Sequence, residues 1–147
     1  MINFLCIAKY FRQGFDRLDL SNAPGRLPGF PNDCCQWAAR MIGHYLKYEC
    51  QLDPVHVCAS RRPPHAAGGH EWIEIDDTII DITPDQFPDQ SQSFIVSNNS
   101  IWHQSWQIGS KEKLIFPITR YDTSGHQIKI SELYEHIAKT VRENCSA

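Results

Sequence analysis

Apolar residues recur at helical spacing in three parts of the chain. Residues 2–18 predict an amphipathic helix through one apolar stripe: Leu5, Ile7, Ala8, Phe11, Phe15 and Leu18. Residues 34–50 predict a second helix on the same grounds, through Ala38, Ala39, Ile42, Tyr45 and Leu46. We expect Asp33 to cap its N-terminus. Residues 131–144 predict a last helix, with Ser131 as its cap and a buried face of Leu133, Tyr134, Ile137 and Val141.

Short apolar runs between these helices predict strands. The expected strands are 55–59, 70–75, 78–83, 94–97 and 114–118, and Asp76-Asp77 predicts a tight hairpin turn between the second and the third. Stretches rich in proline and glycine predict loops over 19–33, 60–69 and 84–93. The segment with Trp102 and Trp106 has no assignment. Helices that precede an antiparallel sheet indicate an α+β fold, and the length fits a single domain over 1–147.

Charge and composition exclude some classes of function. The net charge of -3 offers no cationic footprint for nucleic acid, and no apolar run approaches the roughly 18 residues that span a bilayer. The apolar N-terminus lacks the basic start and cleavage site of a signal peptide. We therefore expect a cytoplasmic protein that binds neither nucleic acid nor membranes, with its six cysteines as free thiols.

Two adjacent cysteines, Cys34 and Cys35, stand where the second helix is expected to begin. A thiol attacks only as a thiolate, and a helix N-terminus together with a nearby imidazole favours that form. The first-turn backbone N–H groups lack helical partners, so one of them can stabilise an oxyanion. Either cysteine therefore suits a nucleophile.

The predicted hairpin supplies a base and an orienting acid. A two-residue turn at 76–77 pairs Ile73 with Ile80 and Trp72 with Asp81, so alternation places His70 and Asp81 on the same face. They are diagonal neighbours roughly 7 Å apart at the backbone, within side-chain reach. Asp81 also interrupts an apolar strand, where a carboxylate is costly without a partner. We expect Asp81 to orient His70.

Three segments of the sequence resemble a known superfamily. The order of Cys, then His at a strand start, then Asp on the next strand resembles the transglutaminase-like branch of the papain-fold cysteine enzymes. Phe30-Pro31-Asn32-Asp33-Cys34-Cys35, His70-Glu71-Trp72 and Ile80-Asp81-Ile82-Thr83-Pro84-Asp85-Gln86-Phe87 are similar to segments of small bacterial proteins with FPxxxC, HxW and IDITxDQF motifs. The likeness covers residues 28–100 and places Cys35, not Cys34, at the cysteine position of the family.

The resemblance implies a papain/transglutaminase-like fold, with the catalytic cysteine at the start of a central helix that packs on the sheet. It also implies acyl transfer on amide bonds through Cys35, His70 and Asp81, as a peptidase, amidase, deamidase or transglutaminase-like enzyme. The expected partner is a protein or peptide substrate, and such a chain can act as a toxin or effector. Asn32, Gln36 and Gln86 are the candidates for the second oxyanion donor, and the residues do not decide among them. The alternative is a non-catalytic protein-binding module that retains the fold.

Metal binding is the remaining alternative for some of these residues. His56 and Cys58 share one face of a strand, and either Cys34 or Cys35 can complete a set with them, while His65 and His70 are further imidazoles. No Cys-x-x-Cys or His-Glu-x-x-His spacing is present. We therefore expect no metal and no cofactor.

Overall fold

The computed structural model describes residues 1–61, 68–123, 125 and 128–145. Within them the chain forms the α-helices α1 Phe4–Arg17, α2 Cys35–His44, α3 Ile101–Gln104 and α4 Ile130–Cys145. The strands are β1 Val55–Arg61, β2 Gly69–Ile75, β3 Thr78–Asp81, β4 Ile95–Ser97 and β5 Trp106–Glu112. They make one antiparallel sheet in the order β4-β3-β2-β1-β5, which confirms the α+β class. None of the described helices has the length and apolarity to cross a membrane.

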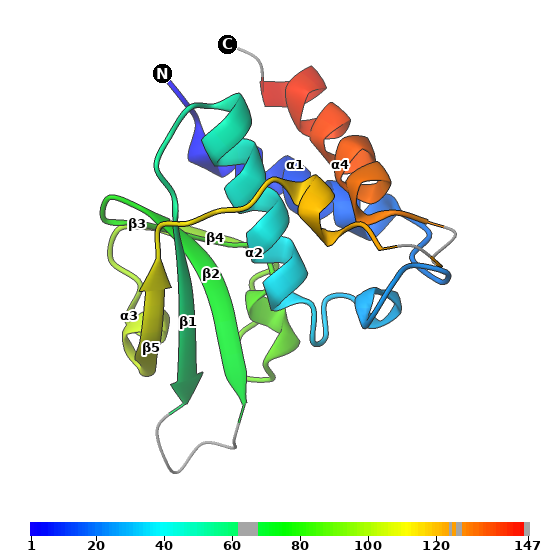
Figure 1. The fold of residues 1–147 in the computed structure, drawn as a ribbon. Coiled ribbons are helices and arrows are strands. Elements are labelled where there is room, and N and C mark those ends of the chain that lie inside the picture. Colours follow the sequence, from blue (N-terminus) through cyan, green and yellow to red (C-terminus); the bar gives the residue numbers. More distant parts are fainter. Residues whose placement is uncertain (62–67, 124, 126–127, 146–147) are drawn as a thin grey trace.

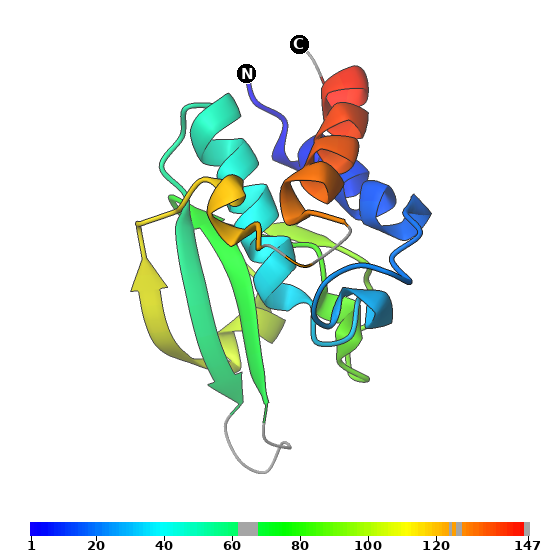
Figure 2. The ribbon, with the colours of Figure 1, turned by 45° about the vertical axis from the view of Figure 1, so that its right-hand side comes forward.

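The three longer helices lie on one face of the sheet and form the main core with it (Figures 1 and 2). α2 runs over β2 and approaches it closely at Gly43, where an added Cβ would stand 3.2 Å from Cδ1 of Ile73. α1 and α4 pack against each other at Gly14, where a Cβ would stand 2.9 Å from Cγ2 of Ile137. The two glycines thus set how closely these elements approach.

A smaller cluster lies on the opposite face of the sheet. Its buried members are Val57, Ala59, Trp72 and Trp106. Phe87, from the loop after β3, and Trp102, from α3, pack against them. The segment left unassigned by the sequence therefore supplies part of this second, aromatic layer.

The start and end of the central helix differ from expectation. α2 begins at Cys35 with Cys34 at the N-cap position and no side-chain cap, while Asp33 adopts a left-handed φ of 57°, so the predicted Asp33 cap is wrong. After His44 the helix continues as a π-helical turn, Tyr45–Glu49, in which the N–H of Cys50 donates to the carbonyl of Tyr45.

The predicted strand over 114–118 is also wrong, because the last strand is β5. β5 is a sheet edge whose side chains are exposed after Trp106, so it lacks the apolar pattern that reveals a strand. The apolar run after it packs instead into the helical core through Ile115 and Ile118. The fourth helix begins one residue before Ser131, and the carboxylate of Asp122 accepts hydrogen bonds from both the N–H and the hydroxyl of Ser131. The expected Ser131 cap is therefore replaced by Asp122.

A disulfide between Cys6 and Cys145 corrects the expectation that all six cysteines are free. The packing of α1 on α4 brings the start of one helix to the end of the other, with the two Cα atoms 5.9 Å apart (Figure 1). Cys34, Cys35, Cys50 and Cys58 are free thiols. The two cysteines are 139 residues apart in the sequence, so the local sequence pattern gives no indication that they pair.

Replacing Cys6 with serine is expected to lower the free energy of unfolding by about 2–4 kcal/mol, because the bond closes a long loop in the unfolded chain. Urea denaturation of the oxidised variant and the parent measures the difference. Cys50→Ser is the control, since Cys50 is a half-buried free thiol. Equal midpoints for the Cys6→Ser variant and the parent would contradict the expectation.

Candidate active site

Cys35 is the first residue of α2, and the residue is only 9% exposed. It lines a cavity of about 390 Å³ together with its neighbour Gln36 and residues of three other segments, among them Arg26, Glu71 and Gln86. The helix start therefore presents the thiol to a space large enough for part of a peptide. Its own N–H is one of the first-turn donors without a helical acceptor.

The predicted hairpin register is confirmed for the three residue pairs of the ladder, Ile73–Ile80, Glu74–Ile79 and Ile75–Thr78. The consequence drawn from it is also confirmed. His70 and Asp81 meet, with Nε2 of the imidazole 2.6 Å from Oδ2 of the carboxylate. Both residues are almost fully buried, so this contact is shielded from water.

His70 lies on the face of the sheet opposite α2, beside Trp72 and Phe87. The thiol of Cys35 lies near enough for its hydrogen bond and charge to contribute to the raised pKa of His70. The ladder between β2 and β3 covers only 73–75, so the first residues of β2 have no partner strand on that side. Nε2 of the ring is bound to Asp81, and Nδ1 lies 3.0 Å from Nε2 of Gln86, a residue that lines the same cavity as Cys35.

The second imidazole on Asp81 belongs to His103, which the sequence analysis missed. Its Nε2 lies 2.7 Å from the same Oδ2 atom, while its Nδ1 lies 2.6 Å from the hydroxyl of Ser100. The N–H of Thr83 donates to the other oxygen of Asp81 at 3.0 Å. The only signal in the sequence is a histidine between two tryptophans, which does not by itself indicate a contact with Asp81.

These contacts shift the pKa values of the buried pair. Burial raises the pKa of Asp81, but the positive charge of His70 and the hydrogen bonds from His103 and His70 outweigh it, so that the pKa is lowered. Burial lowers the pKa of His70, but the charge and hydrogen bond of Asp81, with smaller contributions from Cys35, raise it to about 9. The imidazole is therefore cationic at neutral pH, which favours a thiolate at Cys35.

Cys34, unlike Cys35, does not line the cavity. It is fully buried, and its thiol donates to the carbonyls of Arg26 at 3.2 Å and Asn32 at 3.1 Å. Burial, and then the charges of Cys35 and Asp33, raise its pKa to about 11. A thiol held in this way is a structural group and not a nucleophile.

The three candidates for the second oxyanion donor are placed differently. The side-chain amide of Gln86 lies beside the base, with Nε2 3.0 Å from Nδ1 of His70, and its Oε1 accepts the N–H of Asp33 at 3.2 Å. Gln36 is exposed at the rim of the cavity. Asn32 is exposed and does not line the cavity. Of the three, Gln86 is the one held in contact with the base.

Arg12 is the second residue that sequence reasoning missed. It comes from α1, is 6% exposed, and forms a two-pronged pair with Asp85 at 2.7 and 2.9 Å. It also donates to the carbonyls of Ile82 at 3.0 Å and Ser93 at 2.8 Å. A charged residue next to Phe11, within the apolar stripe of α1, was the available signal. Arg12 fixes the loop that carries Gln86.

The chain matches no protein-family model, no curated protein and no solved structure.

Proposed function

We propose that the protein is a cysteine-dependent enzyme that transfers acyl groups from amide bonds of a protein or peptide. One observation carries the proposal: Cys35 stands at a helix N-terminus beside His70, whose second ring nitrogen is bound by the buried carboxylate of Asp81. Nucleophile, base and orienting acid in this order are the arrangement that cysteine acyl transfer requires.

The first step is attack of the Cys35 thiolate on a carboxamide carbonyl, which gives a tetrahedral oxyanion. The amine then leaves as its C–N bond breaks, taking the proton from Nδ1 of His70, and a thioester to Cys35 remains. In the second step His70 removes a proton from water or an acceptor amine, which attacks the thioester and releases Cys35. Asp81 keeps the imidazole oriented throughout.

Two donors suit the oxyanion. The N–H of Cys35 belongs to the unpaired first turn of α2, and Gln86, which lines the same cavity, holds its amide nitrogen 3.0 Å from Nδ1 of His70. Because Arg12 holds the neighbouring Asp85, the position of Gln86 is fixed before a substrate binds. Such preorganised donors contribute most to catalysis of acyl transfer.

Iodoacetamide near neutral pH is expected to alkylate Cys35 before any other free cysteine. Burial raises the pKa of the other three, Cys34, Cys50 and Cys58, which leaves them as unreactive thiols. Peptide mass spectrometry over a time course measures each rate. The His70→Gln variant should slow the labelling of Cys35 about 10-fold or more and leave that of Cys50 unchanged.

Equal, slow labelling of Cys35 and Cys50 in the parent would contradict the proposal and favour a protein-binding module. A reactive Cys35 permits the next measurement, in which candidate proteins are incubated with the parent and with Cys35→Ala and then weighed by mass spectrometry. Backbone cleavage indicates a peptidase, exchange of an amide for an acid indicates a deamidase, and loss of ammonia with cross-linking indicates a transglutaminase.

A further inference from the structure

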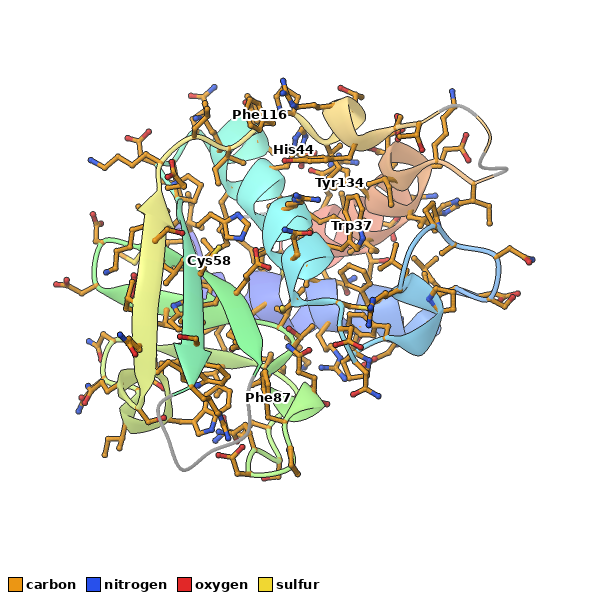
Figure 3. All side chains as sticks on the ribbon, turned by 60° about the horizontal axis from the view of Figure 1, so that its bottom comes forward. Trp37, His44, Cys58, Phe87, Phe116 and Tyr134 are labelled. Carbon is orange, nitrogen blue, oxygen red and sulfur yellow. A yellow bond between two sulfur atoms is a disulfide. The ribbon has the colours of Figure 1, made fainter. Side chains whose placement is uncertain are left out.

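A second cluster of ligating side chains lies on the helix-bearing face of the sheet. Cys58 on β1 stands directly opposite Glu71 on β2, and His56 precedes Cys58 by two residues, on the same face. Nε2 of His56 lies 2.7 Å from Oε1 of Glu71, and Sγ of Cys58 lies 3.4 Å from the same oxygen. Figure 3 shows Cys58 over β1, beside α2.

We propose that His56, Cys58 and Glu71 form a binding site for one zinc-type divalent ion, with three protein ligands and one open position. Their ligand atoms, one from each residue, all lie within 4.8 Å of one another. An imidazole, a thiolate and a carboxylate are the donors that zinc accepts, and three of them with a free fourth position is the arrangement of reactive zinc sites. The sequence suggested Cys34 or Cys35 as the third ligand, and the structure places Glu71 there.

Charge and access favour an ion at this place. A thiolate and a carboxylate together balance a dication, so the filled site carries no net charge. The side chains of His56 and Glu71 are 15% and 18% exposed, and Glu71 also lines the cavity of Cys35, so the open position is reachable from solvent. Arg40, the cation whose charge acts on Glu71, lies over the ring of Tyr121 at 4.2 Å.

The other group of possible ligands, His70, Asp81 and His103, is a poorer site. Each of the three is at most 2% exposed, and the two imidazoles already occupy the same carboxylate oxygen at 2.6 and 2.7 Å. An ion there would have to displace both hydrogen bonds at a site that is closed to solvent. The half-buried cluster has one such contact to exchange for an ion, between His56 and Glu71, and both side chains are partly open to solvent. Its thiol loses its proton when it coordinates a metal.

Cobalt(II) titration of the full chain tests the proposal, because a cobalt–thiolate bond gives a charge-transfer absorption in the near ultraviolet. We expect one equivalent of cobalt to produce that band and one equivalent of zinc to remove it. Cys58→Ser should abolish the band, and His56→Ala should weaken zinc binding at least about 100-fold, more than the loss of an outer-sphere partner costs. Circular dichroism verifies that both variants fold.

Cys50→Ser and Cys35→Ala are the matched controls, and both should keep the band. The proposal is overturned if the parent gives no band, if Cys58→Ser retains it, or if Cys35→Ala loses it. The Cys35→Ala variant also separates this site from the proposed acyl transfer. It removes the alkylation target and leaves the metal ligands intact, so the two proposals can fail independently.

Discussion

Asp81→Asn is expected to lower the free energy of unfolding by about 3–5 kcal/mol, the usual cost of removing one partner from a buried ionic pair. Asparagine has nearly the same shape, but it carries no charge to balance the His70 imidazolium. Its N–H₂ group also has to face N–H donors, either those of His70 and His103 or that of Thr83. Urea denaturation at neutral pH measures the loss. Asp77→Asn, an exposed change in the turn of the same hairpin, is the control.

The pH dependence of stability gives the same variant a sharper test. The pKa of His70 is raised from an ordinary 6.5 to about 9 in the folded protein. The protonated imidazole therefore makes its full contribution to the free energy of unfolding below about pH 6.5. This contribution, up to about 3 kcal/mol, is lost as the pH rises through about 9. Without Asp81, burial lowers the pKa of His70, and the variant should lack this loss. An equal decline in the parent and the variant between pH 6.5 and 9 would contradict the assignment.

Asp81→Asn should also slow the alkylation of Cys35 about 10-fold or more, because a neutral imidazole no longer favours the thiolate. This second readout distinguishes a functional contact from a structural one. A variant that loses stability but keeps the parental labelling rate would make Asp81 a folding residue only.

The parts of the site that follow from local rules could be predicted. A two-residue turn fixes the pairing of its strands, and alternation then fixes the shared face of His70 and Asp81, so that the 2.6 Å contact was accessible from the sequence. The helix start at Cys35 also follows from local pattern. The choice of Cys35 over Cys34, which the resemblance suggested, gains a physical reason from the burial and hydrogen bonds of Cys34.

The parts that were missed depend on contacts distant in sequence. His103 reaches Asp81 from a four-residue helix that is too short for a periodic pattern. β5 is paired on one side only, so its exposed residues carry no apolar alternation. The disulfide joins residues near the two ends of the chain. The predicted loop over 60–69 and His65 lie largely or wholly outside the described residues.

Arg12→Met is expected to lower the free energy of unfolding by about 3–5 kcal/mol and to slow the alkylation of Cys35. The guanidinium holds Asp85 and two carbonyls, and it lies 5.0 Å from the ring centre of Phe30, in the loop before α2. Methionine fills the space of the stem but leaves the carboxylate and the carbonyls without donors. Denaturation and alkylation measure the two effects. Arg17→Met, exposed on the same helix, should change neither.

A double variant separates two contributions to the free energy of unfolding: the cost of leaving Asp85 unpaired, and the net stabilisation by the Arg12–Asp85 ion pair. If the penalty of Arg12→Met comes mainly from the stranded carboxylate of Asp85, then Asp85→Leu in the same chain should restore part of the stability, since neutral partners tolerate burial better than one unpaired charge. The labelling rate of Cys35 should not recover with it, because the loop beside Gln86 still lacks the hydrogen bonds that Arg12 donates to Ile82 and Ser93. Recovery of both quantities would mean that Arg12 stabilises the fold without positioning Gln86.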